Sequence, residues 1–355
     1  RIRNLDMRDI KNKLTTGKNT KTIQQRRAKG FGYQVLGFGA GGSGPPFVEA
    51  SGGTITTTGD YKIHTFASPG TFTVTNAGSA TEGIVDYFVV AGGGGGGNNG
   101  YPQQRAGGAG GGGGFRLSNA TAQVAAPVMS PLSAPAGLNV TAQGYPITVG
   151  AGGVGGQPAT NSGAFQGFIG ASSIFSSITS TGGGGGGGHP LISGGPSPVP
   201  GGPHDGGSGA SDVSPGRGGN TPPTSPPQGN NGGNGVAQPP ATFSAGGGGG
   251  AGGVGGNSSG QSGGNGGIGS FVADAVGSAT PTAYGTPGPV GSTRYFSGGG
   301  GGINGGNGSP AGGGTAWQGP DAAANTGGGG GGNQFNNGNA CTGGSGIVIL
   351  RYKYQ

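Results

Sequence analysis

The feature that most constrains this chain is its glycine, which fills 100 of 355 positions and is gathered into runs of five or more residues. A glycine in a helix interior costs about 1 kcal/mol relative to alanine, so long α-helices are nearly excluded. The runs also break the Gly-X-Y period that a collagen triple helix needs. What remains is either a disordered chain or a fold in which glycine itself is the packing residue.

Three observations favour the ordered alternative. Only 29% of the residues are hydrophobic and 8% are charged, too few apolar residues for a conventional core over this length. A flexible linker would mix serine into its glycine, whereas these runs are nearly pure. A three-residue period appears beside them, as in GGVGGQ at 152–157 and GGVGGN at 252–257.

Three residues per turn is the period of the left-handed polyproline-II helix, which glycine can adopt. We therefore predict a bundle of such polyglycine-II helices, held together by main-chain hydrogen bonds of about 1 kcal/mol each. A helix inside the bundle must be glycine on every face. A helix on its outside can carry a side chain at every third residue, which would explain Val154, Val254, Ile268 and Ile303.

Residues outside the glycine runs indicate β-strands. Short strands are expected at Tyr33–Leu36 and Thr54–Thr57, and Ile84–Val90 should be buried on both faces. Further strands are expected at Tyr145–Val149 and Gly346–Tyr354, and the two ends of the body should meet in one sheet.

A hairpin is also expected early in the chain. The segments Tyr61–Phe66 and Thr71–Thr75 flank Ser68-Pro69-Gly70, a tripeptide typical of turns.

The predicted fold class is thus mostly β with a bundle of polyglycine-II helices, and with little helix apart from a short N-terminal one. We divide the chain into four parts by composition. They are a basic arm at 1–30, a small β-domain at 31–91, a glycine-rich bundle at 92–345 with an insert at 115–149, and a closing strand at 346–355.

Nearly all of the net charge lies in the first part. Residues 1–30 hold ten Lys or Arg and two acids, which gives +8, so the remaining residues carry 7 − 8 = −1. Such an arm can engage nucleic acid, an acidic protein or an anionic surface, or can be a solvated tail. We expect it to anchor the chain on another protein rather than on nucleic acid, through Arg1, Arg3, Arg8, Lys11, Arg26 and Arg27.

No catalytic or cofactor motif in the sequence has the neighbouring residues that its function requires. Gly37–Gly42 matches the dinucleotide pattern G-x-G-x-x-G, but Pro45 and Pro46 follow where a helix is required. No Lys-Ser/Thr pair follows a glycine run as in a P-loop, and no G-x-S-x-G elbow is present. We therefore expect no enzyme activity and no cofactor.

Metal binding and membrane insertion are not expected either. His189, His204 and Asp205 could bind a metal, but their spacing is irregular. No apolar run approaches the length of a membrane span.

Four segments together resemble a known family. TFTVTNAG at 71–78, VDYFVVAGGGGGG at 85–97, YPITVGAGG at 145–153 and GGSGIVILRYKY at 343–354 are similar to the glycine-rich domain of bacteriophage tail-fibre proteins. That group is related in style to the distal adhesins of T-even-type phages. The resemblance implies layers of polyglycine-II helices whose connecting loops recognise the bacterial surface.

On this resemblance we expect an extracellular virion protein, a tail-fibre or tail-tip adhesin. Its partners would be a host surface glycan or outer-membrane protein, and a virion protein that holds residues 1–30. The sequence leaves open whether the chain forms a homo-oligomer. Exposed aromatic and cationic side chains among Asn, Ser and Gly suit the binding of sugars and protein surfaces. The residues expected in these receptor-binding loops are Tyr101, Arg105, His189, Tyr284, Arg294, Tyr295, Phe296, Trp317 and Phe335.

Alternatives remain open at this point. The aromatic residues could instead cap the ends of the bundle and keep water out. The same fold could decorate a capsid or tail, or repeat as the subunit of an extracellular filament. Ice binding is a third class, but it predicts a regular ladder of small residues, which the proline-broken spacing here does not provide.

Overall fold

A computed structural model describes residues 47–98, 106–121, 130–157, 165–188, 215–238, 242–272, 284–289, 293–304, 306–309, 312–316, 319–333 and 338–355. The chain divides into two compact units, Arg1–Pro45 and Pro46–Gln355, and all described residues belong to the second. The basic arm, the predicted strand Tyr33–Leu36 and the glycine motif at 37–42 lie outside the described residues. No helix in the described ranges is long and apolar enough to cross a lipid bilayer.

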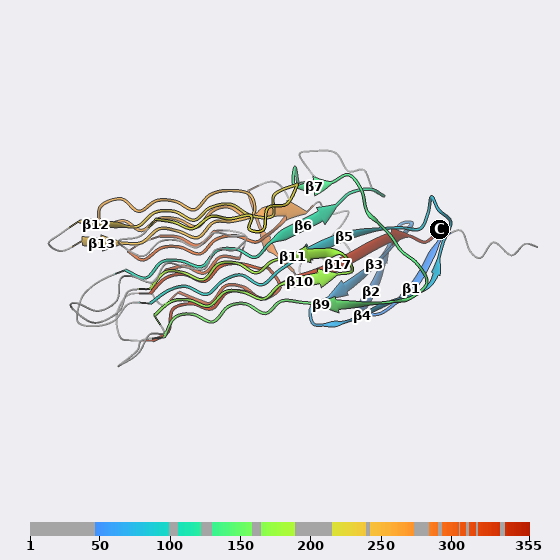
Figure 1. The fold of residues 1–355 in the computed structure, drawn as a ribbon, viewed down its shortest axis with the longest axis horizontal. Coiled ribbons are helices and arrows are strands. Elements are labelled where there is room, and N and C mark those ends of the chain that lie inside the picture. Colours follow the sequence, from blue (N-terminus) through green and yellow to red (C-terminus); the bar gives the residue numbers. More distant parts are fainter. Residues whose placement is uncertain are drawn as a thin grey trace, which may run out of the picture. The chain divides into compact units, whose positions relative to one another are not determined.

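The regular elements of the described ranges are all β-strands. They are β1 Val48–Ser51, β2 Thr54–Thr58, β3 Tyr61–Phe66, β4 Gly70–Ala77, β5 Ile84–Val90, β6 Phe115–Ser118, β7 Ser133–Ala134, β8 Leu138–Asn139, β9 Gly144–Thr148, β10 Ser173–Phe175, β11 Ile178–Ser180, β12 Val236–Gln238, β13 Thr242–Ser244, β14 Ser270–Val272, β15 Thr286–Pro287, β16 Arg294–Phe296 and β17 Ile347–Lys353. In Figure 1 the larger sheets stand at one side and the glycine-rich segments run away from them, side by side.

The largest sheet has seven strands and joins the start of this unit to its end. Its order is β2-β3-β17-β5-β6-β7, and β8 pairs with β5 outside that path. β17 lies between β3 and β5 and pairs antiparallel with both. The prediction that the two ends of the body meet in one sheet is therefore confirmed.

The predicted hairpin is wrong. β3 and β4 do not pair with each other, because β3 has β2 on one edge and β17 on the other. With both edges of β3 filled, the chain crosses at Ser68-Pro69-Gly70 into a second sheet, where β4 pairs with β1 and β9. The tight hairpin lies one turn earlier, where Thr58 pairs with Tyr61 around Gly59-Asp60. Gly59 has φ +56°, which a two-residue hairpin loop needs and glycine permits.

The second sheet has five strands in the order β1-β4-β9-β10-β11. The side chains between it and the seven-stranded sheet form the main hydrophobic core. The aromatic centre of this core is Phe72, whose ring lies edge-on to those of His64 and Phe175. The core residues are Val48, Phe66, Phe72, Val74, Val85, Tyr87, Val89, Val140, Tyr145, Ile147, Phe175, Val348, Leu350 and Tyr352.

A second core covers the other face of the seven-stranded sheet. Alternation along β5 sends Val85, Tyr87 and Val89 to the first core and Phe88 and Val90 to the second. The expectation that this strand is buried on both faces is therefore confirmed. Phe88 packs against Phe296 of β16 with ring centroids 4.8 Å apart. β16 belongs to the small sheet β14-β16-β15, so this contact ties the large sheet to the glycine-rich part.

The glycine-rich segments are extended and bonded to one another through their backbones. Ala91–Asn98 lies at the centre, and its amides turn to three neighbours in rotation. The amides of Ala91, Gly94 and Gly97 donate to carbonyls of one neighbour, those of Gly92, Gly95 and Asn98 to a second, and those of Gly93 and Gly96 to a third. The accepting segments are 108–114, 165–171 and 341–344.

The carbonyls of the same central segment follow the same rotation. They accept from Gly183 and Gly186, from Gly153 and Gly156, and from Gly330 and Asn333. Six segments thus surround residues 91–98, and each is met at every third residue. This period differs from the two-residue period of a β-strand and equals the three residues per turn of a polyproline-II helix.

The same geometry explains why the central residues are glycine. A Cβ placed on Gly92 or Gly95 would overlap the carbonyl of Ala151 or Val154. A Cβ on Gly93 or Gly96 would overlap residues 328–331, and one on Gly94 or Gly97 residues 184–187. Every face of this segment therefore excludes a side chain.

The expectation for the outer segments holds at three positions and fails at one. Val154, Val254 and Ile268 are 49%, 65% and 38% exposed, as predicted for outward positions. Ile303 is fully buried, in a small cluster with Ala106, Ala245 and part of Phe243. A turn follows Ile303, and Asn304 bonds to the Phe243 carbonyl, so the isoleucine faces inward.

Candidate binding surfaces

The end of the bundle away from the two large sheets is the first candidate surface (Figure 1). The described chain leaves it at Asn98, Gln157, Gly188 and Asn333 and returns after each gap. Asn98 and Asn333 are buried there, and their side-chain amides donate to carbonyls of Gly156, Gly338 and Asn339. These side chains bond to backbone carbonyls where the glycine runs stop, and so hold the ends of the runs in place.

Most of the predicted receptor-binding residues fall between the described ranges, four of the nine in these gaps and Trp317 in another. Tyr101, Arg105, His189, Trp317 and Phe335 lie outside the described residues, as do the arm residues Arg1, Arg3, Arg8, Lys11, Arg26 and Arg27. His204 and Asp205 lie outside them too. Within the described ranges, no group of three His, Cys, Asp or Glu side chains comes together as a metal site would require.

Four predicted loop residues are described, and they are not exposed loop side chains. Arg294, Tyr295 and Phe296 form β16, and Tyr295 and Phe296 are 2% and 3% exposed. Tyr284 packs partly buried against the second core, and Arg294 donates to the carbonyls of Tyr284 and Gly285. Phe296 packs on Phe88 of the large sheet, and the Tyr295 ring lies against that of Phe271, so both rings face inward.

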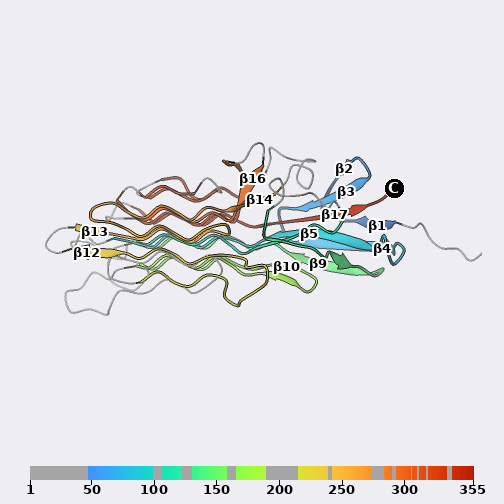
Figure 2. The same cartoon turned by 90° about the horizontal axis from the view of Figure 1, so that it is seen from above.

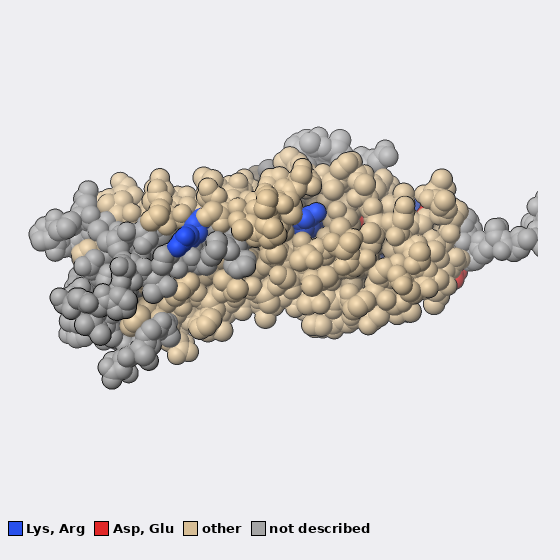
Figure 3. Space-filling model, in the orientation of Figure 1, with Lys and Arg blue, Asp and Glu red and all other residues tan. Residues whose placement is uncertain are grey.

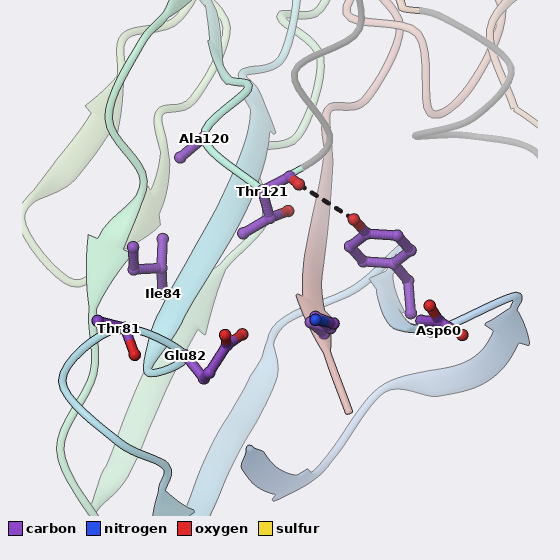
Figure 4. A pocket seen from close by; sticks show the side chains of 8 residues that line it. Asp60, Thr81, Glu82, Ile84, Ala120 and Thr121 are labelled. Atoms are coloured by element: carbon purple, nitrogen blue, oxygen red, sulfur yellow. Dashed lines mark hydrogen bonds between the residues drawn. The ribbon is translucent and has the colours of Figure 1, made fainter. Parts of the chain in front are cut away.

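A polar hollow of about 390 Å³ lies on the sheet side, lined by Asp60, Tyr61, Thr81, Glu82, Ile84, Ala120, Thr121 and Lys353. Figure 4 shows Asp60 and Glu82 on opposite sides of it. The Tyr61 hydroxyl donates to the Thr121 carbonyl at 3.0 Å, which fixes one wall.

A buried ion pair holds that wall in place. Asp86 and Arg351 are each 2% exposed, with Nη2 and Oδ2 3.5 Å apart. The Asp86 carboxylate also accepts from the hydroxyls of Ser118 and Thr121 and from the backbone amides of Ala120 and Thr121. Burial lowers the pKa of the Arg351 guanidinium, and the Asp86 carboxylate opposes that shift. The pair secures the chain after β6, which is a structural role.

His64 is buried in the main core and predicts a pH-dependent stability. Its Nδ1 lies 2.7 Å from the Gly52 carbonyl and its Nε2 3.0 Å from the Tyr352 hydroxyl. A carbonyl only accepts, so Nδ1 carries the proton and the neutral ring accepts from Tyr352 at Nε2. Burial, with a smaller contribution from Lys62, lowers the His64 pKa below 6.5.

A lowered pKa means that the unfolded chain binds the proton more readily than the folded one. The contribution to stability is therefore complete above about pH 6.5 and is lost as the pH falls towards the folded-state pKa. We expect the free energy of unfolding, measured with urea at steps from pH 7.5 to 5, to fall over that window. In His64→Gln the fall should be smaller, and an unchanged slope would contradict this assignment.

Cys341 is 5% exposed, and its thiol donates to the Gly319 carbonyl at 3.2 Å. Burial raises its pKa from 9 to about 11. The reactive species is the thiolate, whose fraction at pH 8 falls about a hundred-fold with that shift. We expect the native protein to resist a thiol reagent such as DTNB, and the urea-unfolded chain to react fully within minutes. Rapid labelling of the native protein would contradict this.

The flanks of the bundle carry exposed apolar side chains that the sequence analysis did not single out. Phe168 and Ile169 are 56% and 49% exposed, beside Val154. A groove of about 260 Å³ lies on another flank, lined by Pro131, Leu132, Pro227, Asn230, Ala251, Gly252, Ile268, Gly269, Ser270, Phe271 and Tyr295. In the face shown by Figure 3, Lys, Arg, Asp and Glu are sparse over the described surface.

Comparison with known proteins gives one family. The profile of the family described as "Glycine-rich domain" matches residues 65–353. No curated protein matches the chain. The matched span runs from β3 to β17 and contains the strands and glycine segments described above. The chain therefore belongs to the glycine-rich domain family.

Proposed function

We propose that the glycine segments are polyglycine-II helices and that they make the unit rigid. The support is the three-residue rotation of hydrogen bonds around residues 91–98, which leaves no face of that segment without a backbone partner. Every amide of 108–114 donates to a backbone carbonyl, whereas in 151–157 only Gly153 and Gly156 donate to a backbone carbonyl of the described residues.

Amide hydrogen exchange, followed by NMR, tests this proposal. We expect protection at every amide of 92–97 and 108–114, and protection at every third amide in 151–157. A two-residue period in 151–157 would indicate a β-strand instead. Fast exchange throughout the glycine runs would indicate a mobile chain, and either result would overturn the proposal.

We infer that this rigid body serves a bacteriophage virion as a tail-fibre or tail-tip adhesin. The observation that carries the inference is the end of the bundle, where the chain repeatedly leaves and re-enters around Asn98 and Asn333. Such an end can present several sequence-variable connections side by side on one stiff support, as binding loops require. Residues 1–30 would hold a virion protein, and the partner at the bundle end would be a host glycan or outer-membrane protein.

The adhesin proposal is tested by binding of the purified full chain to host cells. Trp317→Ala and Tyr101→Ala should each lower cell retention at least ten-fold without changing the urea midpoint. Thr57→Ala, on the exposed face of β2, is the control and should bind like the parent. Tyr295→Ala is unsuitable because that ring is buried. Parent-level retention in both variants would contradict the proposal.

A second candidate is a structural subunit that decorates a particle or repeats in a filament. The exposed apolar side chains on the flanks favour it, because a particle-bound or filament subunit needs lateral contacts. Copy number separates the two candidates. A few copies per purified particle, counted by quantitative mass spectrometry, support the adhesin, and tens or more support the structural subunit.

A further inference from the structure

We propose that copies of this chain associate side by side, with an apolar ridge on one flank of the bundle seated in an apolar groove on the flank of the next copy. The ridge is formed by Val154, Phe168 and Ile169. The groove is the one lined by Leu132, Ile268 and Phe271 among others. The proposal concerns the flanks and does not depend on host binding at the end of the bundle.

The ridge is a fixed feature. The Phe168 amide donates to the Val154 carbonyl at 2.9 Å, and the Phe168 carbonyl accepts from Gly95 in the central segment, also at 2.9 Å. The three side chains are nonetheless about half exposed. An aromatic ring held out from a rigid backbone loses little entropy when it binds, so it makes a good anchor.

The groove suits a side chain better than a free ligand. Its volume of about 260 Å³ is below the roughly 300–1,000 Å³ of small-molecule pockets. Its lining is mostly proline, aliphatic and aromatic, and Val254 stands 65% exposed on the same segment as Ala251 and Gly252. A phenyl ring with neighbouring aliphatic groups is the partner that this lining accepts.

Ridge and groove lie on different sides of the bundle at a similar level along it. Figures 1 and 2 both draw the green segment around residue 155 apart from the orange segments around 255–269. A relay of lateral hydrogen bonds crosses between them, in which each amide donates to the next carbonyl. It runs through Gly267, Gly248, Gly300, Gly110, Gly330 and Gly94, next to the Gly95 that bonds Phe168. Copies in the same orientation can therefore bring ridge to groove.

The backbone and the charges point to a second copy as the occupant. On the ridge side, the amides of Gly152, Val154 and Gly155 donate to no carbonyl of the described residues, unlike those of 108–114. Residues 131–188 and 218–273, which carry the ridge and most of the groove, contain no Lys, Arg, Asp, Glu or His. Contact between two such surfaces buries no charge, and the amide of the exposed Val154 can meet another extended chain.

Because ridge and groove are different surfaces, a pair of copies still has one unoccupied groove on the first copy and one unoccupied ridge on the second. Such a contact is heterologous and adds copies in a row instead of stopping at a dimer. Both ends of every unit stay uncovered, so the row is compatible with either proposed function.

Sedimentation of the full chain across a concentration series tests this. We expect the parent to associate reversibly, and Phe168→Asp and Ile268→Asp each to weaken association at least ten-fold with an unchanged urea midpoint. Ile55→Asp is the matched control, since Ile55 is 45% exposed on β2, and it should associate like the parent. A mixture of the two variants should form a 1:1 pair that does not grow, because one intact ridge meets one intact groove.

Three results would overturn the proposal. One is a parent that stays monomeric at every concentration. Another is association that survives both aspartate variants. The third is a variant mixture that stays monomeric, which would show that an intact ridge and an intact groove do not bind each other. A parent chain that associates but is not retained by host cells would overturn the adhesin proposal alone.

Discussion

Gly95→Ala is expected to destabilise the protein by about 4 kcal/mol or more, or to prevent folding. The new Cβ would overlap the carbonyl of Val154, a backbone atom that cannot move without its segment. Overpacking alone costs about 1–3 kcal/mol. Moving residues 153–156 would also strain their bonds to Gly93 and Gly96, at about 1 kcal/mol each. Urea unfolding of parent and variant measures the loss.

Gly218→Ala is the matched control. Gly218 also lies in a glycine-rich stretch, but the nearest atom to an added Cβ is the Asn231 side-chain oxygen, at 3.9 Å. Its stability should stay within about 0.5 kcal/mol of the parent, as for most surface substitutions. Equal stability of the two variants would mean that the glycine runs are not packed as described.

Asp86→Ala is expected to cost about 3–5 kcal/mol, because it leaves the Arg351 charge buried without its carboxylate. The backbone amides of Ala120 and Thr121 also lose their acceptor. Arg351→Met should cost less, since the carboxylate then keeps its donors from the Ser118–Thr121 segment. The urea midpoints of the two variants give the order directly.

Lys353→Met serves as the control for this pair. Lys353 lies two residues after Arg351 on β17 but is only partly buried, and its loss should change stability by less than about 0.5 kcal/mol. An Asp86→Ala variant as stable as Lys353→Met would show that the ion pair contributes little.

Local pattern was sufficient for the longer strands of the two large sheets, but not for short ones such as β6, β10 and β11. The β-branched and aromatic runs at Ile84–Val90 and Ile347–Lys353 are strands, and both are buried on both faces. Pattern failed where pairing decided the result. Ser68-Pro69-Gly70 has the composition of a hairpin turn, yet it connects two sheets, because β17, nearly 300 residues later in the chain, fills the edge of β3.

For the candidate binding surfaces too, the sequence identified unusual residues and the structure decided which of them are exposed. The sequence shows that Tyr295, Phe296 and Ile303 are rare bulky residues among glycines, but it does not show which way they face. The structure buries all three and exposes Phe168 and Ile169 instead. The direction in which such a side chain points depends on which neighbours surround its segment, and those neighbours come from distant parts of the chain.

The sequence by itself therefore determined the kind of packing that this protein can use. A chain with this much glycine in runs has too few residues for long α-helices or for an apolar core over its whole length, and its glycine runs must bond backbone to backbone if they are to be ordered. Only the tertiary structure decided which segment lies at the centre of the bundle, which strands share a sheet and which side chains reach the surface. Glycine carries no side chain that could specify a partner, so the order of the bundle is set by the connections and by the strands that frame it.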